Sequence, residues 1–212
     1  KKQLDAMAKL KINVFHWHLT DNQAWRLESK IHPELCSPEV QERFKGQFYT
    51  QEEIRDIIDF CTERGISVIP EIDMPGHSKA FTRAIGHDMQ SAEGMAILKE
   101  VVREAAGVFK ECEYFHIGCD EVKITNPSFV PEMVDFVHSL GMKVMAWNPG
   151  FGFEECGVDM EQYWMSTGEI REGVPTIMSS NIYLNHFDSF TDIRRIYSDK
   201  CCGRDEADST MY

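Results

Sequence analysis

The chain has 212 residues, of which 42% are hydrophobic and 27% charged, and this composition indicates one globular domain rather than a disordered protein. Its formal net charge of -13 argues against nucleic acid and anionic membrane surfaces as partners, because both favour basic patches. No run of about 18 apolar residues occurs, so the sequence predicts no transmembrane helix, and its start, KKQLDAMAKLKINVF, contains no apolar core of a signal peptide.

The cysteines give no sign of a metal site. They contain no CxxC pair and stand at Cys36, Cys61, Cys112, Cys119, Cys156, Cys201 and Cys202. Structural zinc sites draw their ligands from closely spaced Cys or His pairs, so we predict no zinc and no other cofactor. Reduced, mostly buried thiols are the simpler interpretation, and they favour a reducing compartment such as the cytoplasm.

The hydrophobic pattern predicts strands and helices that alternate along the chain. The strands are expected at residues 12–19, 66–72, 114–117, 143–147, 161–164 and 176–184. The helices are expected at residues 4–10, 50–64, 93–109, 130–140, 168–171 and 191–197, with irregular loops at 21–23 and 29–48. Thr50 and Glu53 form a capping box at the start of the second helix, and Gly65 ends it.

This alternation predicts a parallel α/β architecture. Functional-looking polar and aromatic residues follow nearly every strand, at His18, Asp21, Asp73, His77, Asp120, Glu121, Trp147, Trp164 and Tyr183. A (β/α)8 barrel of the TIM type collects such residues from all strand ends on one face, whereas a doubly wound sheet concentrates them at one switch point. No GxGxxG follows the first strand, so a dinucleotide-binding fold is not supported.

The stretch YFHIGCDEV, residues 114–122, is the centre of the pattern. Its apolar start predicts a buried strand, and the two acids Asp120 and Glu121 follow at the carboxyl end of that strand. Two carboxylates are costly to place there unless they have a use, which favours a catalytic pair. The alternative is an acid pair in the first turn of a helix, where Asp and Glu are favoured.

Three motifs resemble those of glycoside hydrolase family 20, the β-N-acetylhexosaminidases. They are HWHLTDNQAWR at residues 16–26, VIPEIDMPGH at 68–77 and FHIGCDEV at 115–122, and they occur in this order at strand ends. The resemblance covers about residues 4 to 196. It implies a retaining exo-glycosidase with a (β/α)8 catalytic domain and no cofactor, acting on glycans that carry N-acetylhexosamine.

The implied chemistry also follows from the acid pair. In retaining glycosidases the acid and the nucleophile lie about 5–5.5 Å apart on either side of the scissile bond, which adjacent residues cannot easily achieve. A 2-acetamido group can supply its own carbonyl oxygen as the nucleophile, and such substrate assistance is a recognised exception to the two-carboxylate scheme. The expected substrate is therefore a terminal β-linked GlcNAc or GalNAc, cleaved through an oxazolinium intermediate.

The resemblance gives roles to individual residues. Glu121 is expected to be the general acid and then the base, with a raised pKa supplied by partial burial and a neighbouring carboxylate. Asp120 is expected to accept the acetamido N–H and to stabilise the oxazolinium. Tyr183 is expected to donate its hydroxyl to the acetamido oxygen, while Trp147 and Trp164 wall the pocket.

Further residues match positions around the acid or the sugar. Asp21, Asp73 and His77 are expected to support Glu121, and Asn185 to contact a sugar hydroxyl. His16 and His18 share one strand face, and we interpret them as hydrogen-bonded core residues rather than substrate contacts.

The chain also departs from the family pattern. Cys119 stands where the family usually has Gly, Asn185 where it usually has Asp, and Asn148 where an acid is common. A small, neutral thiol is expected to be tolerated at residue 119. The arginine of the family's first strand and the Trp and acid of its last strand do not occur in residues 1–212. We therefore expect a single partial domain of about six barrel units, with a poorly patterned tail from about residue 200, unstable or inactive by itself.

Two other functions remain open from the sequence. A metal-dependent, sugar-processing barrel enzyme can draw nitrogen and oxygen ligands from His16, His18, Glu71, Asp73 and Asp120. An inactive carbohydrate-binding homologue is the third possibility, although the intact Asp120–Glu121 pair argues against it.

Overall fold

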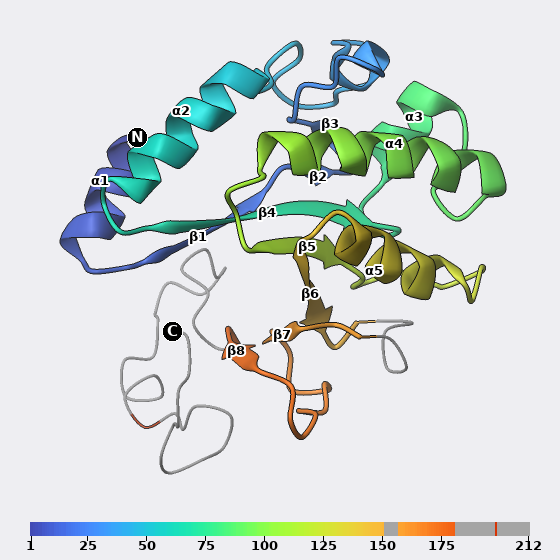
Figure 1. The fold of residues 1–212 in the computed structure, drawn as a ribbon. Helices are drawn as coiled ribbons and strands as arrows, with labels where there is room; N and C mark the ends of the chain where they lie inside the picture. The colour runs from blue at the N-terminus through green and yellow to red at the C-terminus, as the bar shows by residue number, and fades with distance from the viewer. Residues whose placement is uncertain (151–156, 181–197, 199–212) are drawn as a thin grey trace.

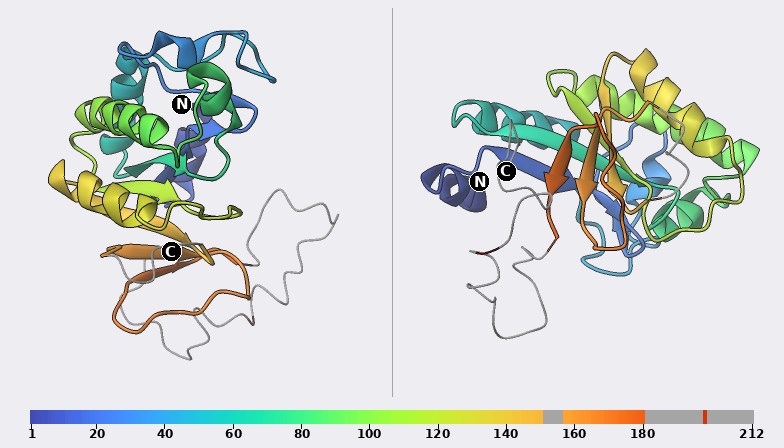
Figure 2. Two further views of the ribbon diagram at one scale, coloured as in Figure 1. Left: turned by 90° about the vertical axis from the view of Figure 1, so that its right-hand side faces the viewer. Right: turned by 90° about the horizontal axis from the view of Figure 1, so that it is seen from below.

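A parallel sheet forms the centre of the computed structural model, which describes residues 1–150, 157–180 and 198 (Figure 1). Its order is β1-β4-β5-β6-β7-β8, and each neighbouring pair is parallel. The strands are β1 (Val14–His18), β4 (Ser67–Met74), β5 (Tyr114–Gly118), β6 (Lys143–Asn148), β7 (Met160–Tyr163) and β8 (Thr176–Met178). Strand direction changes progressively across the sheet, so the sheet curves like part of a barrel wall (Figure 2). The expectation of a TIM-type (β/α)8 architecture is confirmed, because the strands follow one another around the sheet in chain order.

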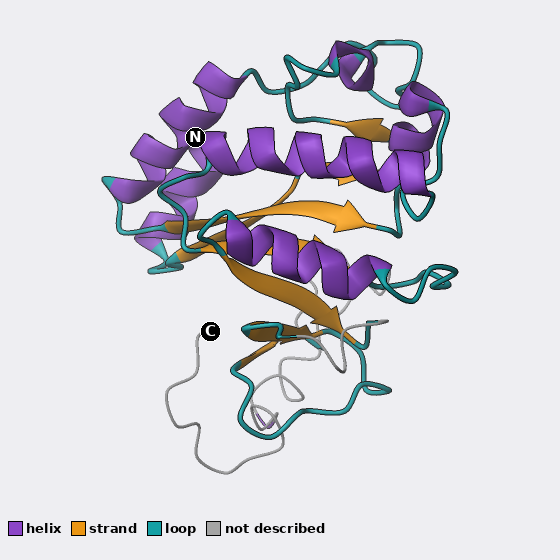
Figure 3. Cartoon of the chain, turned by 45° about the vertical axis from the view of Figure 1, so that its right-hand side comes forward, coloured by secondary structure: helices purple, strands orange, loops and turns teal. Residues whose placement is uncertain are grey.

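Helices cover the outer side of this sheet, as Figure 3 shows. The helical elements are α1 (Lys2–Lys9), the 3-10 helix η1 (Pro33–Cys36), α2 (Gln51–Thr62), α3 (Lys79–Ile85), α4 (Ala92–Val108) and α5 (Phe129–Ser139). The predicted capping box at the start of α2 is present: the Glu53 N–H donates to Thr50 Oγ1 at 3.1 Å, and the Thr50 N–H donates to Glu53 Oε2 at 2.8 Å. Two backbone donors at the helix start are thereby satisfied. No helix in the described part of the chain is long and apolar enough to span a bilayer.

The alternation of side chains along each strand separates two clusters of buried residues. On β5, Phe115 and Ile117 pack into the large cluster shared with Leu98 and Val102 of α4. A smaller cluster on the inner face of the sheet joins Ile69, Met145 and Met160, with Val14, Tyr114 and Ile177 packed against it. Residues that alternate with Phe115 and Ile117, such as His116, therefore face the interior of the barrel wall.

Most predicted elements are observed, and three segments differ from the prediction. The expected loop at 21–23 contains a short hairpin, β2 (Thr20–Asp21) and β3 (Ala24–Trp25), and helix α3 was not predicted. The helix expected at 168–171 was wrong. The Asn148 amide Nδ2 donates to the Glu169 carbonyl at 2.7 Å, and an added Cβ at Gly168 would lie 2.5 Å from Asn148 Oδ1, so contact with β6 shapes that segment instead. The strand expected at 176–184 is observed as β8, and the expected helix at 191–197 and the tail lie outside the described residues.

Candidate active site

A cavity of about 170 Å³ lies at the carboxyl ends of the strands. Its lining is His18, Asp73, His77, Asp120, Glu121, Trp147 and Trp164. These residues come from the ends of β1, β4, β5, β6 and β7 or from the loops that follow them. The expectation that side chains after successive strands converge is therefore met for these residues, while Tyr183 and Asn185 lie outside the described part of the chain.

The acid pair lies in a strained loop rather than in a helix. Strand β5 ends at Gly118, and helix α5 begins only at Phe129, so the first-turn interpretation of the pair was wrong. Cys119 and Glu121 have φ values of 77° and 48°, in the left-handed region. That region costs a non-glycine residue about 1–2 kcal/mol, which explains why Gly suits position 119. Strain of this kind concentrates at functional sites.

Two glycines allow the loops of the site to pack closely. A Cβ added at Gly118 would lie 1.9 Å from Asp73 Oδ1, so the end of β5 packs directly against that carboxyl group. A Cβ added at Gly76 would lie 2.6 Å from the Asp120 carbonyl oxygen. The turn after β4 therefore rests on the acid-pair loop, and this contact places His77 above the acids.

His77 bridges the acids and Asp21. Its Nε2 lies 3.2 Å from Glu121 Oε2 and 3.9 Å from Asp120 Oδ2, and its Nδ1 lies 3.5 Å from Asp21 Oδ1. Contact with Asp21 is the main cause that raises the pKa of His77 to about 9, so the imidazole is cationic at neutral pH. Burial opposes the ionisation of Asp21, but its contacts with His18 and His77 lower the pKa of that carboxyl group.

Glu121 is more exposed than its expected role requires. Its side chain is 56% exposed, whereas that of Asp120 is 14% exposed. The expected burial is thus only partial, at a residue whose backbone is left-handed. The expected neighbouring carboxylate is present.

Two buried carboxyl groups form the floor of the cavity. Asp73 is 1% exposed, and burial followed by the charges of Glu71 and Asp120 raises its pKa to about 8, so it is mainly protonated at neutral pH. Burial also raises the pKa of Asp120. Within the described residues, Asp120 Oδ1 and Asp73 Oδ1 are buried without a hydrogen-bond partner. Gly118 packs against Asp73 Oδ1, whereas Asp120 Oδ1 is available to accept a hydrogen bond from a bound molecule.

Glu71 lies beneath this floor, fully buried on β4. Its Oε1 accepts a hydrogen bond from the Trp147 indole Nε1 at 3.0 Å. Its Oε2 lies 2.7 Å from His16 Nε2 and 2.9 Å from His18 Nδ1, close charge contacts without the alignment of hydrogen bonds. The sequence offered Glu71 only as a possible metal ligand. Its position in register with His18 on β1, two residues before Asp73, was the available signal that it faces the site.

The charge that balances Glu71 resides on His18. Burial opposes ionisation of Glu71, yet the surrounding imidazoles of His116, His16 and His18 hold its pKa well below the usual value. Burial keeps His116 itself neutral, with its pKa lowered to about 3. Burial also lowers the pKa of His18, but Asp21 and Glu71 outweigh it and raise that pKa to about 10. The expected interpretation of His18 as a core residue is only partly met, because its side chain is 40% exposed and lines the cavity.

Among the residues that the structure describes, three groups of side chains have the spacing to hold a metal ion. They are His16, Glu71 and His116; His18, Glu71 and Asp73; and Asp73, His77 and Asp120. In the first group, His116 Nδ1 accepts the Gly118 backbone N–H at 3.0 Å, so Nε2 carries the proton of the neutral ring. His116 therefore fits a packing role better than a ligand role, and its ring stacks edge-on against Trp147 at 4.9 Å.

The two tryptophans of the cavity are each held by an indole hydrogen bond. Trp164 Nε1 donates to the Pro149 carbonyl at 2.8 Å, as Trp147 donates to Glu71. Asn148 is 5% exposed, and its amide donates to Glu161 Oε2 at 2.7 Å, so its side chain supports the wall rather than contacting the cavity. The departure at position 148 is thus accommodated by a buried carboxylate on β7.

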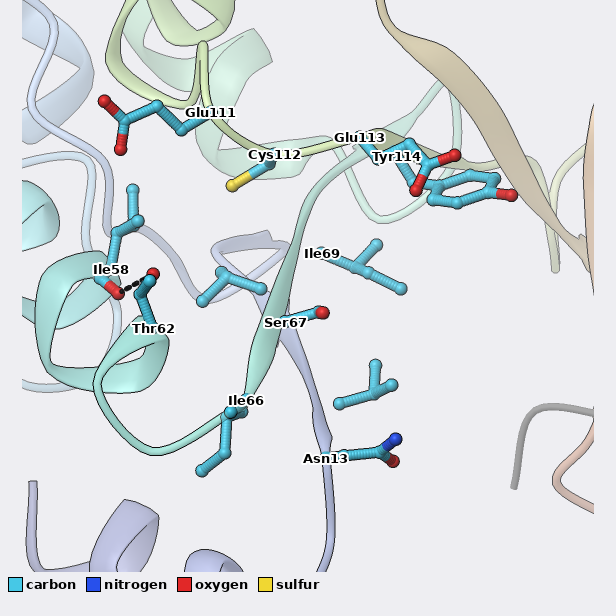
Figure 4. A pocket seen from close by; sticks show the side chains of 13 residues that line it. Asn13, Ile58, Thr62, Ile66, Ser67, Ile69, Glu111, Cys112, Glu113 and Tyr114 are labelled. Atoms are coloured by element: carbon cyan, nitrogen blue, oxygen red, sulfur yellow. Dashed lines mark hydrogen bonds between the residues drawn. The ribbon is translucent and has the colours of Figure 1, made fainter.

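A larger cavity of about 440 Å³ lies at the opposite end of the strands (Figure 4). Its lining mixes aliphatic and polar residues from the amino ends of β1, β4 and β5 and the end of α2, and it includes Asn13, Ile58, Thr62, Ile66, Ile69 and Tyr114. Glu111 and Glu113 stand at its margin without an imidazole in the lining. The smaller cavity, not the larger one, therefore has the charge arrangement of a catalytic site.

Known proteins resemble this chain in both sequence and structure. Residues 1–93 match the catalytic domain of glycosyl hydrolase family 20. The "Beta-hexosaminidase" of Porphyromonas gingivalis is 40% identical over 149 residues, which cover 57% of this chain and 19% of that protein. The "Beta-hexosaminidase" of Vibrio furnissii is 36% identical over 158 residues, which cover 58% of this chain and 26% of that protein. Over these residues the chain is similar to members of glycosyl hydrolase family 20.

Solved structures of family 20 share the fold. The β-N-acetylhexosaminidase of Bacteroides fragilis aligns with a TM-score of 0.73 and 28% identity, covering 85% of this chain and 46% of that one. The exo-β-N-acetylglucosaminidase of Vibrio harveyi, solved in complex with N-acetylglucosamine, aligns with a TM-score of 0.67 and 28% identity, covering 78% of this chain and 35% of that one. The chain thus spans less than half the length of these family 20 relatives.

Proposed function

We propose that this chain carries the catalytic site of a β-N-acetylhexosaminidase, a retaining exo-glycosidase that releases terminal β-linked N-acetylhexosamine from glycans. The names of the relatives support this activity. The observation that carries the proposal is the acid pair: Asp120 presents a buried oxygen without a partner among the described residues, beside an exposed Glu121 that His77 contacts. Trp147 and Trp164 wall the same cavity, as the CH-rich faces of a sugar require.

In the first step, Glu121 gives its proton to the glycosidic oxygen while the acetamido carbonyl oxygen attacks the anomeric carbon. The bond to the leaving oxygen breaks, the leaving group departs as an alcohol, and a bicyclic oxazolinium forms. Asp120 accepts the hydrogen bond of the acetamido N–H, and its negative charge stabilises the positive charge that develops on that ring. In the second step, water attacks the anomeric carbon and gives a proton to Glu121, which restores both the acid and the acetamido group.

His77 supports the change of charge on Glu121. After Glu121 donates its proton it becomes an anion, and cationic His77 lies 3.2 Å away. Because an opposite charge at this distance favours the carboxylate, His77 stabilises the state that proton transfer produces. Tyr183 as a donor to the acetamido oxygen, and Asn185 as a contact to a sugar hydroxyl, remain predictions from the resemblance. We also infer that the described elements belong to one catalytic domain, because a single sheet joins them.

The decisive experiment compares two aryl β-glycosides with the full-length protein, one with a 2-acetamido group and one with a 2-hydroxyl group. The proposal expects hydrolysis of the acetamido substrate alone, and its loss in Glu121→Gln. Glu111→Gln is the matched control, since Glu111 is an exposed acid at the other end of β5. Equal hydrolysis of both substrates would contradict substrate assistance.

The metal-dependent alternative has the three side-chain groups described above in its favour. Treatment of the full-length protein with a chelator separates the two functions. Loss of hydrolysis that a divalent cation restores would favour the metal-dependent enzyme. Unchanged hydrolysis would favour the hexosaminidase, and binding of the acetamido glycoside without turnover would identify a carbohydrate-binding homologue.

A further inference from the structure

A continuous series of charged contacts runs from the interior of the barrel wall to the acid. In order, it joins Trp147 Nε1 to Glu71 (3.0 Å), Glu71 to His18 (2.9 Å), His18 to Asp21 (3.2 Å), Asp21 to His77 (3.5 Å) and His77 to Glu121 (3.2 Å). From Glu71 onward acids and imidazoles alternate, so each of the two imidazoles lies between two carboxyl groups. The part from Glu71 to Asp21 has no role in the reaction steps described above.

We propose that His18, held in place by Glu71, is a positioning residue that fixes Asp21 and thereby holds His77 against the acid Glu121. The inference rests on the proposed function, because it takes Glu121 as the proton donor. It assigns His18 an action through Asp21 and His77, not a contact with the substrate.

The placement of His18 between two carboxylates carries the first part of the argument. Nδ1 lies 2.9 Å from Glu71 Oε2 as a charge contact, and Nε2 lies within hydrogen-bond distance of Asp21 Oδ2 at 3.2 Å, so a doubly protonated ring places one N–H beside each acid. The acidic groups that face it are Asp21, Glu71 and Asp73, and its raised pKa agrees with a charged ring at neutral pH. Glu71 is fully buried and needs such a partner, because an unpaired buried charge is strongly destabilising.

The second part of the argument concerns what holds Asp21. Asp21 lies in the two-residue strand β2 of a short hairpin, outside the main sheet. Its side chain contacts His18, His77 and its neighbouring Asn22 N–H. Of these, only His18 belongs to a strand of the main sheet, and Glu71 on the adjacent strand fixes its ring. His18 therefore links the Asp21 side chain to the rigid sheet, while the backbone of β2 is held separately by the Asp73 N–H, which donates to Thr20 Oγ1 at 3.1 Å.

The test measures the pKa of His77 by NMR in the full-length protein, with and without substitution of His18. In His18→Ala, we expect the pKa of His77 to fall by about one unit or more towards its ordinary value of about 6.5, because Asp21 loses its anchor. The charges that face His77 come from Asp21, Asp73, Asp120 and Glu121. Removal of the His18 charge alone would raise the pKa of His77, so an increase or no change would overturn the proposal.

Two conservative variants separate the two nitrogens of His18. The amide nitrogen of Gln occupies the approximate place of Nε2, and that of Asn the place of Nδ1. We expect His18→Gln to keep the pKa of His77 at or above the wild-type value, because it keeps the contact with Asp21 but loses the charge, and His18→Asn to lower it as Ala does. If His18→Ala does not fold, the comparison of His18→Gln with His18→Asn still tests the proposal. Equal pKa values of His77 in these two variants would overturn it. His138→Gln is the matched control. His138 also pairs with an acid, since its Nε2 lies 2.7 Å from Asp159 Oδ2, but this pair lies outside the site.

A double substitution tests whether His18 acts through Asp21. In an Asp21→Asn background, His18→Ala is expected to leave the pKa of His77 unchanged, and a further fall would overturn the proposed route. If the wild-type protein hydrolyses neither aryl glycoside, the proposed function fails, whereas the His77 measurement still decides the positioning role.

The activity of the same variants adds a second readout. With the acetamido glycoside, His18→Ala is expected to lower kcat by about tenfold, since a small displacement of a catalytic group has effects of this order. KM is expected to stay within about twofold of the wild-type value. A rise in KM with unchanged kcat would mean that His18 contacts the substrate, and it would overturn the positioning role.

Discussion

The two ends of the inner face of the sheet use the same strands for different purposes. At the amino end, Ile69, Met145 and Met160 pack together as an apolar cluster. Two residues further along β4 and β6, the same face carries Glu71 and Trp147, which are joined by a hydrogen bond. Because residues two apart on a strand point to the same face, the inner face changes from apolar packing residues to residues of the candidate site within two positions. The carboxyl end thus relies on the apolar layer beneath it as a rigid base.

The cavities at the two ends reinforce this contrast. The amino-end cavity is the larger, at about 440 Å³ against about 170 Å³, but its lining contains no imidazole. The smaller cavity brings three carboxyl groups and two imidazoles into contact, and several of their pKa values depart from the ordinary range. Concentrated charge, rather than volume, distinguishes the candidate site.

The largest effect is expected from the acid pair. Glu113 precedes β5 and Asp120 follows it, so Asp120→Asn and Glu113→Gln neutralise one acid at each end of one strand. Asp120→Asn is expected to reduce hydrolysis of the acetamido glycoside by about 100-fold to 1,000-fold, because the charge opposite the oxazolinium is lost. Glu113→Gln is expected to leave kcat unchanged. Steady-state kinetics measures both variants. A similar loss of kcat in both would contradict the assignment of catalysis to the carboxyl end of β5.

The amino end is expected to govern stability instead. Met160→Ala removes a buried side chain from the apolar cluster and is expected to lower the free energy of unfolding by about 2–5 kcal/mol. The KM and the pH dependence of the folded variant are expected to match the wild type. Urea denaturation measures the free energy of unfolding. Initial rates, measured under conditions in which the variant is folded, give KM and the pH dependence. A changed pH profile would show that the two ends are not separable.

Two glycines at opposite ends of the sheet provide a matched pair. Gly65 and Gly118 both have positive φ, 67° and 70°, but only a Cβ at Gly118 would collide with Asp73. Each Gly→Ala change is expected to cost about 1–3 kcal/mol in stability through backbone strain. Only Gly118→Ala is expected to lower kcat as well, because it displaces Asp73. Equal kcat values in the two variants would contradict the close packing of β5 on that carboxyl group.

A pH dependence of stability is also expected from Asp73. Its pKa is raised to about 8 in the folded protein, against about 3.9 in the unfolded chain. The folded state therefore holds the proton more tightly, and its stabilising contribution is complete below pH 4 and is lost as the pH rises through 8. Asp73→Asn is expected to flatten the decline between pH 4 and 8, measured by urea denaturation, while Asp56→Asn on the exposed face of α2 leaves it unchanged.

Local sequence signals predicted much of this fold. The capping box placed the start of α2, and the apolar run before the acid pair placed β5 to within one residue. The short helix α3 was missed because its seven residues give a brief pattern directly after a Pro-Gly turn. The helix expected at 168–171 was wrong because Asn148, distant in sequence, hydrogen-bonds into that segment.

The candidate site also has features that local sequence predicted and features that it did not. The positions of Asp73, His77, Asp120 and Glu121 after their strands were predictable from the motifs, and they do meet at one cavity. The exposure of Glu121 was not predictable, because it depends on the left-handed backbone at that residue. The hydrogen bond from Trp147 to Glu71 joins residues 76 positions apart, so only the pairing of β4, β5 and β6 reveals it.

The burial of Glu71 also has a consequence for how the sheet assembles. Its carboxylate finds partners on β1 and on β6, while its own strand lies between β1 and β5. A slip of β4 by one residue would turn this charge towards the apolar layer under the helices and would place Ile72 among the imidazoles. A sheet with β4 out of register is thus destabilised by an unpaired buried carboxylate, so Glu71 favours the native register during folding.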